Sequence, residues 1–344
     1  MRSEWITKRP VIAMAKPLPF PGSIRNRGEK IDVIASKMLD EVKILVDGGV
    51  DGILLQNFND GPNRQDASRE SCSYMTRVAS DIRREYPDLV IGILMCWDGP
   101  GSIIVAEASG ADFVRVEHVY CGAEMTAAGI IQGQCVETLK MRKALCSNMP
   151  IYADVYEPHS LPIIKEPIES ALYETVKGGL ADGLFLCGHS AEESKEYARI
   201  AKSMFPEVPC ICGGGSNKDN VGALLEVFDG VCVGAWIKDG SLNNPVNPEK
   251  LRLYMDEVRR RRGERFFQNT GFLISAVSVM LTSILWLLSR ISQIEGRNLL
   301  EEYLVNIREA WLPTFWLLLL LWVQNAAEYS VSATMSLVAF LLMT

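Results

Sequence analysis

Before Phe266 the chain repeats one unit eight times: a short apolar run, then a polar link, then an amphipathic stretch. The near-continuous apolar character of the runs is typical of parallel strands that helices cover on both faces. The predicted strands are Val11–Ala15, Asp51–Leu55, Val90–Cys96, Asp112–Val116, Ile151–Val155, Asp182–Leu186, Pro209–Cys212 and Gly230–Ala235.

Between these runs, apolar residues recur at helical spacing. The predicted helices are Ile31–Val46, Tyr74–Tyr86, Ser102–Ser109, Ile131–Leu145, Glu169–Val176, Glu192–Met204, Lys218–Val227 and Pro248–Arg262. Eight strand–helix units over this length predict an α/β fold, a closed (β/α)8 TIM barrel of about 250 residues. A doubly wound open sheet is the alternative, which the lack of a G-x-G-x-x-G motif after the first strand disfavours.

Four of the strands begin in a similar way, in the segments GGVDGILLQN, SGADFVRVEH, GLADGLFLCG and VFDGVCVGA. The pattern predicts a helix that ends on glycine and an aspartate that opens the next strand. Such aspartates would lie at the bottom of the barrel, away from the functional end. We therefore interpret them as stabilising residues and not as catalytic ones.

Overall charge and cysteine usage limit the partners and the compartment. A net charge of −7 argues against nucleic acid as a partner. The nine cysteines include no C-x2-C pair, and several fall inside the apolar runs, as buried thiols of a reducing compartment do. The N-terminal residues contain no apolar signal segment, so an intracellular location is expected.

The segment Val208–Gly240 predicts an anion site. Its first strand ends at the glycines Gly213, Gly214 and Gly215, a helix follows, and the next strand ends at Gly234 and Ala235. Backbone N–H groups freed by glycine bind anions, and paired loops after the last two strands of a barrel often hold phosphate. These five residues are the predicted phosphate-binding set. The alternative is that the glycines are simple turn residues.

Polar residues at the carboxyl ends of the strands form the predicted catalytic mouth, since function sits at this end of such barrels. Asp154, His159 and Glu117 are the predicted catalytic residues, because a carboxylate with a histidine partner suits general acid–base work. Asn57, Arg115, His118 and Lys238 are the predicted substrate-binding residues. For Asp154 the alternative is a buried structural ion pair with a neighbour such as Arg115.

No cofactor and no metal ion are expected. The histidines near the mouth could ligate a metal, but no short ligand motif such as H-E-x-x-H occurs. Lys16 and Lys238 are the lysines at strand ends, and nothing further in the sequence marks either as an imine-forming residue, so covalent catalysis is disfavoured.

Residues 10–262 resemble the BtpA/SgcQ family in several stretches. These are PLPFPGS, GGVDGILLQNF, GADFVRVEHVYCG, GIIQG, YADVYEPHS and NVGALLEVFDGVCVGAWIKDGSLNNPVN. The resemblance implies a barrel of the ribulose-phosphate-binding kind, and it implies no particular reaction. Arg115, Asp154, His159, the glycines and Lys238 match the family pattern.

Other positions in the mouth depart from that pattern. The family favours lysine before His159, an Asn-Asp pair at Trp97-Asp98 and asparagine at Glu117, and it favours Gly-Ser-Gly where this chain has Gly213–Gly215. Thr126-Ala127 and Ser190-Ala191 also differ from the family's Thr-Asp and Thr-Gly. These departures put the family's chemistry in doubt for this chain.

The composition changes after Arg265, which places the predicted barrel domain at 1–265 and a hydrophobic helical tail at 266–344. Segments at about 272–289, 311–323 and 331–343 are candidate transmembrane helices, although the last two are short for a span. A helical hairpin that faces the core or a partner is the alternative. Part of the tail is weakly similar to Mpv/PMP-type organelle membrane proteins.

The tail leads to a predicted location at a membrane, mitochondrial or of another organelle. The basic residues Arg259–Arg262 precede the first apolar segment, which predicts that the barrel lies on the cytosol- or matrix-like side. The alternative is that these arginines form the solvated end of the last helix.

The sequence leads to two hypotheses for the function of the protein. The first is a barrel that binds or acts on a small phosphorylated metabolite through isomerase- or lyase-like proton transfer. The second is a catalytically silent barrel that serves as a membrane-tethered scaffold. A homo-oligomer is compatible with either, and whether the chain is an enzyme is left open.

Overall fold

The computed structural model describes residue 6, residues 9–145 and residues 147–263. Eight parallel strands form a closed barrel in which neighbours along the chain are neighbours in the sheet, and the last strand pairs with the first. The strands are β1 (Val11–Ala15), β2 (Gly52–Gln56), β3 (Val90–Leu94), β4 (Phe113–Val116), β7 (Ile151–Asp154), β8 (Gly183–Leu186), β9 (Cys210–Cys212) and β10 (Gly230–Val233). The predicted (β/α)8 barrel is confirmed.

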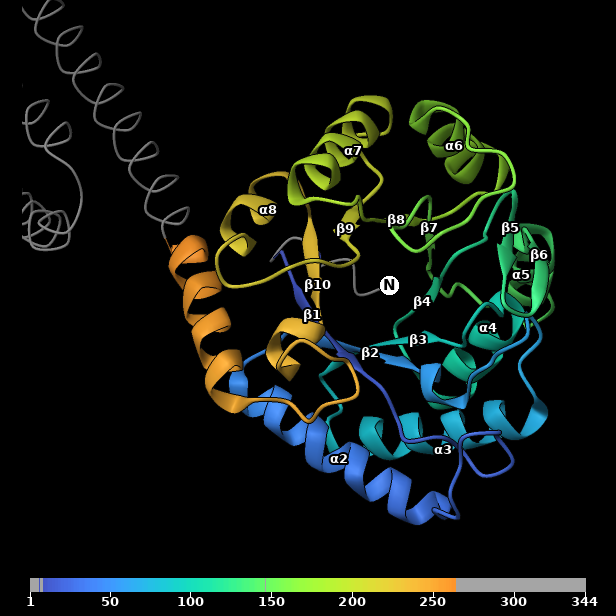
Figure 1. Ribbon diagram of the computed structural model, residues 1–344, viewed down its shortest axis with the longest axis vertical. Helices are drawn as coiled ribbons and strands as arrows, with labels where there is room; N and C mark the ends of the chain where they lie inside the picture. The colour runs from blue at the N-terminus through green and yellow to red at the C-terminus, as the bar shows by residue number, and fades with distance from the viewer. Residues whose placement is uncertain (1–5, 7–8, 146, 264–344) are drawn as a thin grey trace, which may run out of the picture. The chain divides into compact units, whose positions relative to one another are not determined.

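Helices surround the strands, as Figure 1 shows in a view along the barrel. They are α2 (Ile31–Gly48), α3 (Arg69–Glu85), α4 (Gly99–Ser109), α5 (Cys135–Ala144), α6 (Ile168–Tyr173), α7 (Ala191–Met204) and α8 (Val221–Val227), with a last helical stretch over residues 248–263. Short helical turns η1 (Phe58–Asp60), η2 (Glu174–Gly178) and η3 (Ala235–Lys238) follow some of the strands and helices.

Successive side chains along each strand point alternately into the barrel and toward the helices, which divides the core into two layers. Ile12 and Met14 of β1 point into the barrel, whereas Val11, Ala13 and Ala15 pack against the helices. The interior layer holds Ile12, Met14, Leu54, Val90, Leu94, Phe113, Tyr152, Phe185, Ile211 and Cys232. This layer fills the barrel below its mouth, so polar groups at the carboxyl ends rest on a packed apolar floor.

The aspartates that open four strands lie at the bottom of the barrel, as predicted. Asp51, Asp112, Asp182 and Asp229 each accept a hydrogen bond from the N–H of the first or second residue of the preceding strand, at 2.8 to 2.9 Å. Each also pairs with a basic residue, respectively Arg262, Arg83, Arg142 and Lys202. The repeated motif therefore ties each strand start to its neighbour and to a helix.

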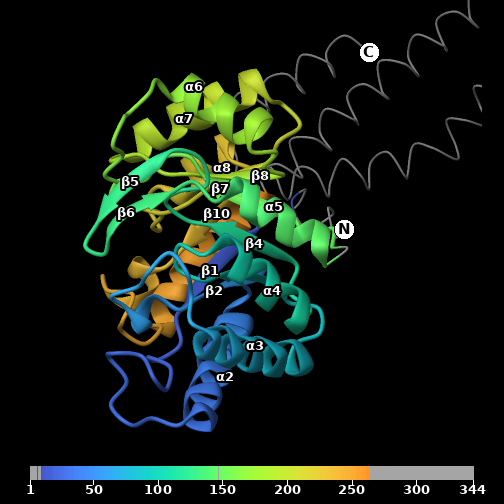
Figure 2. The same ribbon diagram turned by 90° about the vertical axis from the view of Figure 1, so that its right-hand side faces the viewer.

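A β-hairpin interrupts the βα pattern after β4, and the sequence analysis missed it. Strands β5 (Ala123–Thr126) and β6 (Gly129–Gln132) pair antiparallel, and they lie along one side of the barrel in Figure 2. The predicted helix Ile131–Leu145 instead begins at Cys135. Gly129, with a φ of +106°, makes the tight turn that starts β6 and takes Ile131 into a strand.

The predicted tail helices at 272–289, 311–323 and 331–343 lie outside the described residues, as does the boundary proposed at 265. Within residues 6, 9–145 and 147–263, no helix is long and apolar enough to cross a membrane.

Candidate functional site

The predicted residues Arg115 and Asp154 meet at the carboxyl ends of two neighbouring strands, β4 and β7. Arg115 Nε lies 3.0 Å from Asp154 Oδ1, and the terminal nitrogen Nη2 lies 2.9 Å from Oδ2. Both side chains are at least 95% buried. This two-pronged ion pair matches the alternative interpretation of Asp154 as a structural partner of Arg115.

Two more carboxylates surround the same guanidinium. Arg115 Nη2 lies 3.7 Å from Glu117 Oε1 and 3.6 Å from Glu157 Oε1, and the guanidinium stacks on the Phe185 ring. Although burial alone would lower the pKa of Arg115, the charges of Asp154, Glu117 and Glu157 raise it well above its ordinary value. We call Glu117, Asp154 and Glu157 the carboxylate cluster.

Glu157 is the member of the cluster that the sequence analysis did not select. Its side chain is 11% exposed, and its buried Oε1 atom accepts no hydrogen bond from the described residues. Burial, followed by the charges of Glu117 and Asp154, raises the pKa of Glu157 well above its ordinary value. A buried carboxyl group with a raised pKa is suited to donate a proton to a ligand.

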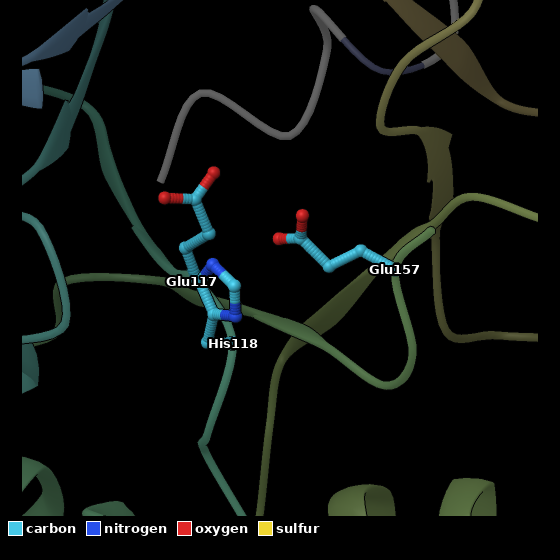
Figure 3. A group of neighbouring side chains, drawn as sticks. All are labelled: Glu117, His118 and Glu157. Atoms are coloured by element: carbon cyan, nitrogen blue, oxygen red, sulfur yellow. The ribbon is translucent and has the colours of Figure 1, made fainter. Parts of the chain in front are cut away.

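Glu117 and His118 each have a fixed orientation. Gln56 donates a hydrogen bond of 2.7 Å to Glu117 Oε2, and His118 Nδ1 lies 2.9 Å from Glu124 Oε2. Burial would lower the pKa of His118, but the hydrogen bond to Glu124 and the charge of Glu117 outweigh burial and raise it. Figure 3 shows the Glu157 carboxylate pointing toward Glu117 and His118.

A metal ion is one way to neutralise this group of side chains. One ligand atom each from Glu117, His118 and Glu157 lies within 4.8 Å of the others, which is close enough to hold a cation. A proton on Glu157 is another way, and it agrees with the direction of the pKa of Glu157. Without a geometric feature that favours the ion, we interpret the cluster as an acid–base group.

Three predicted residues lie elsewhere or have other partners. Lys238 Nζ lies 2.7 Å from Glu41 on α2, and Asn57 Oδ1 accepts a 2.7 Å hydrogen bond from the N–H of Cys96. His159 is exposed and forms no hydrogen bond with any described residue, so it is not the partner of Asp154. For these three residues, catalytic or binding roles stay predictions.

The first glycine loop lies next to the cluster. Gly213 donates a 2.9 Å hydrogen bond to Leu186, and a Cβ atom added to Gly213 would lie 3.6 Å from Arg115 Nη2. The N–H groups of Gly214 and Gly215 donate no hydrogen bond to the described residues, and Gly215 has a φ of +71° that favours glycine. These two N–H groups are available to an anion.

The helix after this loop does not contribute its N-terminus. Asn217 Oδ1 accepts hydrogen bonds from Asp219 and Asn220, and the Asn220 side chain bonds Gly215 and Asn217. The first N–H groups before α8 are therefore capped by the chain itself. Any anion at the first glycine loop would therefore depend on the N–H groups of that loop. The second predicted loop, at Gly234 and Ala235, follows the neighbouring strand β10.

A cavity lies between the β5–β6 hairpin and the helical segment of α6 and η2, and no residue of the carboxylate cluster lines it. Its volume is about 380 Å³, and its lining includes Val155, Tyr156 and Glu124, the hydrogen-bond partner of His118. A space of this size suits a small-molecule ligand.

Comparison with known proteins decides the family. Residues 7–260 match the model of the BtpA family. The chain belongs to the BtpA family. It is 34% identical to an uncharacterised protein of Methanocaldococcus jannaschii over 249 residues, which is 71% of this chain and 93% of that protein.

Two named relatives extend the BtpA family match. The chain is 30% identical to the photosystem I biogenesis protein BtpA of Synechocystis, covering 73% of this chain and 88% of that protein. It is 25% identical to the putative sgc region protein SgcQ of Escherichia coli, covering 74% and 96% of the two chains. The resemblance to the BtpA/SgcQ family is confirmed.

The predicted location at an organelle membrane is wrong. The matched relatives include proteins of an archaeon and of a cyanobacterium, and these organisms have no mitochondrion or similar organelle. The apolar segments that motivated the prediction lie outside the described residues, and no helix within those residues could span a membrane.

Proposed function

We propose that this BtpA-family barrel binds a small phosphorylated metabolite at its mouth and transfers a proton on it, as an isomerase or lyase does. The observation that supports this most is the position of Arg115. Its guanidinium contacts the carboxylate cluster and also lies beside Gly213 of the first glycine loop. An anion on that loop would therefore have the cluster directly beside it.

The binding half of the proposal rests on the free N–H groups of the first glycine loop. Gly214 and Gly215 offer donors that no described residue uses, and Arg115 supplies a positive charge nearby. Backbone donors and a guanidinium are a strong combination for a phosphate. Gly234 and Ala235 of the second loop complete the proposed cradle.

The chemical half assigns different roles within the cluster than the sequence suggested. Asp154 is held by both of its oxygens and orients Arg115. Glu157 is the proposed acid, since burial raises its pKa, and Glu117 is the proposed base. Two carboxyl groups whose environments differ can divide acid and base work between them.

The second hypothesis was a catalytically silent barrel that acts as a membrane-tethered scaffold. Nothing in the described residues or in the comparisons favours it. Its remaining motivation is the set of departures from the family pattern, such as Glu117. That substitution adds a carboxylate to the mouth, which favours chemistry over its loss.

Ligand-dependent thermal stability tests the proposal. Sugar phosphates, triose phosphates and inorganic phosphate are added to the full chain, and a ligand present at 100 times its Kd should stabilise the fold by about 2.7 kcal/mol. Gly214→Asp should abolish the effect through charge repulsion. Gly214→Ala should keep it, because the added Cβ would meet only Cys187 Sγ at 3.4 Å. No stabilisation by any phosphorylated compound would refute the proposal.

A further inference from the structure

Lys16 stands out as a buried lysine without a counter-ion. It follows the last residue of β1 at the mouth of the barrel, and only 7% of it is exposed. No carboxylate among the described residues lies within ion-pair distance of its Nζ atom. Within the described part of the chain, Nζ lies over the face of the Phe58 ring, 3.8 Å from the ring centroid.

The second buried lysine provides a direct comparison. Lys238 is 1% exposed, and its amino group lies 2.7 Å from Glu41 Oε1. The fold thus neutralises one buried lysine with a glutamate and leaves the other on an aromatic ring. A buried charge without a partner costs stability, so an unpaired lysine at a strand end suggests a functional use.

The surroundings of Lys16 favour its neutral amine. Burial lowers the pKa of Lys16, and the charges of Lys238 and Arg115 lower it further, while Glu117 opposes them. Arg115 and Glu117 belong to the site described above, so Lys16 lies in the same mouth. A neutral amine at that place is a nucleophile.

We propose that Lys16 forms a covalent imine with the carbonyl carbon of a phosphorylated aldehyde or ketone. The phosphate part rests on the proposed function, whereas the amine chemistry rests on Lys16 alone. The sequence disfavoured an imine because nothing distinguished Lys16 from Lys238. Their different partners in the fold supply that distinction.

The atoms balance without an oxidant or a reductant. The Lys16 nitrogen attacks the carbonyl carbon, and the C–N bond forms as the carbonyl π bond breaks. A proton then passes from the nitrogen to the oxygen and gives a carbinolamine. The carbinolamine oxygen takes a proton from an acid of the cluster, for which Glu157 is the candidate, and leaves as water. A protonated imine remains, and Glu117, the proposed base, can accept the proton from the adjacent carbon.

Trapping by borohydride tests the proposal. The full chain is incubated with dihydroxyacetone phosphate or with glyceraldehyde 3-phosphate, treated with sodium borohydride, and analysed by intact mass and peptide mapping. We expect one reduced adduct per chain, on Lys16. Excess inorganic phosphate should suppress it, and dihydroxyacetone without phosphate should label at least tenfold less.

Variants make the result specific. Lys16→Arg and Lys16→Met should give no adduct, and thermal unfolding of both checks that they fold. Lys37→Arg changes an exposed lysine on α2 and should label like the parent protein. An adduct spread over surface lysines, or retained in a folded Lys16→Met protein, would overturn the assignment.

The outcomes also separate this inference from the proposed function. If phosphorylated compounds stabilise the chain but no adduct forms with either probe, the imine is wrong and the proposed function stands. If Lys16 is trapped equally with and without the phosphate on the probe, the amine assignment stands and the phosphate cradle fails. A rate of Lys16 acetylation that rises between pH 7 and pH 9 as steeply as that of Lys37 would count against a neutral amine, because an amine with a lowered pKa is already partly neutral at pH 7.

Discussion

The side chain of Arg115 contacts carboxylates that come from two neighbouring strands and the loop after one of them. Asp154 holds it through two hydrogen bonds, and Glu117 and Glu157 lie 3.6 to 3.7 Å from it. Three carboxyl groups around one guanidinium exceed its charge, so at least one of them gains by holding a proton. We propose that this group is the buried Glu157, since burial raises its pKa and its Oε1 atom accepts no hydrogen bond from the described residues.

Removing Asp154 should therefore change both stability and charge. Breaking a buried ion pair costs about 3 to 5 kcal/mol, and Asp154→Ala should lose an amount near the lower end because Glu157 can ionise in its place. Urea unfolding measures the loss, and the carboxyl band in the infrared spectrum reports a fall in the pKa of Glu157. Asp154→Asn, which keeps the shape, is the matched variant. Unchanged stability in Asp154→Ala would show that the pair is not as the structure has it.

The raised pKa of Glu157 should make the stability of the fold depend on pH. Because its pKa is raised in the folded state, the stabilisation is complete below the ordinary glutamate pKa and is lost as pH rises toward the folded value. Glu157→Gln imitates the protonated acid. The variant should therefore gain stability relative to the parent by up to about 1.4 kcal/mol per pH unit within that window.

Urea unfolding of parent and variant at pH 5, 6, 7 and 8 measures this difference. Glu166→Gln, at an exposed glutamate in the same loop, controls for the loss of one charge and should show a constant difference. A constant difference for Glu157→Gln as well would mean that Glu157 is ionised throughout.

At the scale of elements, a row of aromatic rings on three neighbouring strands supports the site from below. The row consists of Phe113 of β4, Tyr152 of β7 and Phe185 of β8. The ring centroids of Phe113 and Tyr152 lie 5.4 Å apart, and those of Tyr152 and Phe185 lie 6.1 Å apart. Arg115 stacks on Phe185 at the top of this row. Glycines on adjacent strands make room for the rings, so packing of the barrel interior fixes the height and direction of the guanidinium.

Gly183 is the position at which this packing can be tested. A Cβ atom there would lie 2.3 Å from the Tyr152 ring, which cannot shift easily between its two aromatic neighbours. Gly183→Ala should lower the free energy of unfolding by about 1 to 3 kcal/mol, as overpacked cores do. Thermal or urea unfolding checks this, with Gly214→Ala as the control in an open loop. An effect no larger than that of the control would mean that the aromatic row is loosely packed.

At the scale of the whole molecule, periodicity was enough to predict the barrel. Each strand is short, apolar and bounded by polar residues, so strand positions such as Val11–Ala15 agree with the structure residue for residue. The β5–β6 hairpin was missed because the apolar residues around Ile131 also fit a helix. Only pairing with Ala123–Thr126 distinguishes the two, and pairing is not a local property.

The candidate site shows the same limit. Arg115, Asp154 and Glu117 could be predicted because they end strands or directly follow them. Glu157 and His159 are near neighbours in one loop, and only the path of that loop buries the first and exposes the second. The partner of Lys238 is Glu41 on a distant helix, so no spacing in the sequence could reveal that Lys238 is neutralised and Lys16 is not.

Exchange of a carbon-bound proton with solvent tests the central claim, that the mouth holds a phosphorylated compound beside groups that move a proton. The compound that stabilises the chain most is incubated with it in D₂O, and ¹H NMR follows the signal of the carbon next to the carbonyl. We predict enzyme-dependent loss of that signal with the parent protein, at least 100-fold slower loss with Glu157→Gln, and none above background with Gly214→Asp. Stabilisation by the compound without any exchange above the buffer rate would contradict the account and leave a barrel that binds its ligand without acting on it.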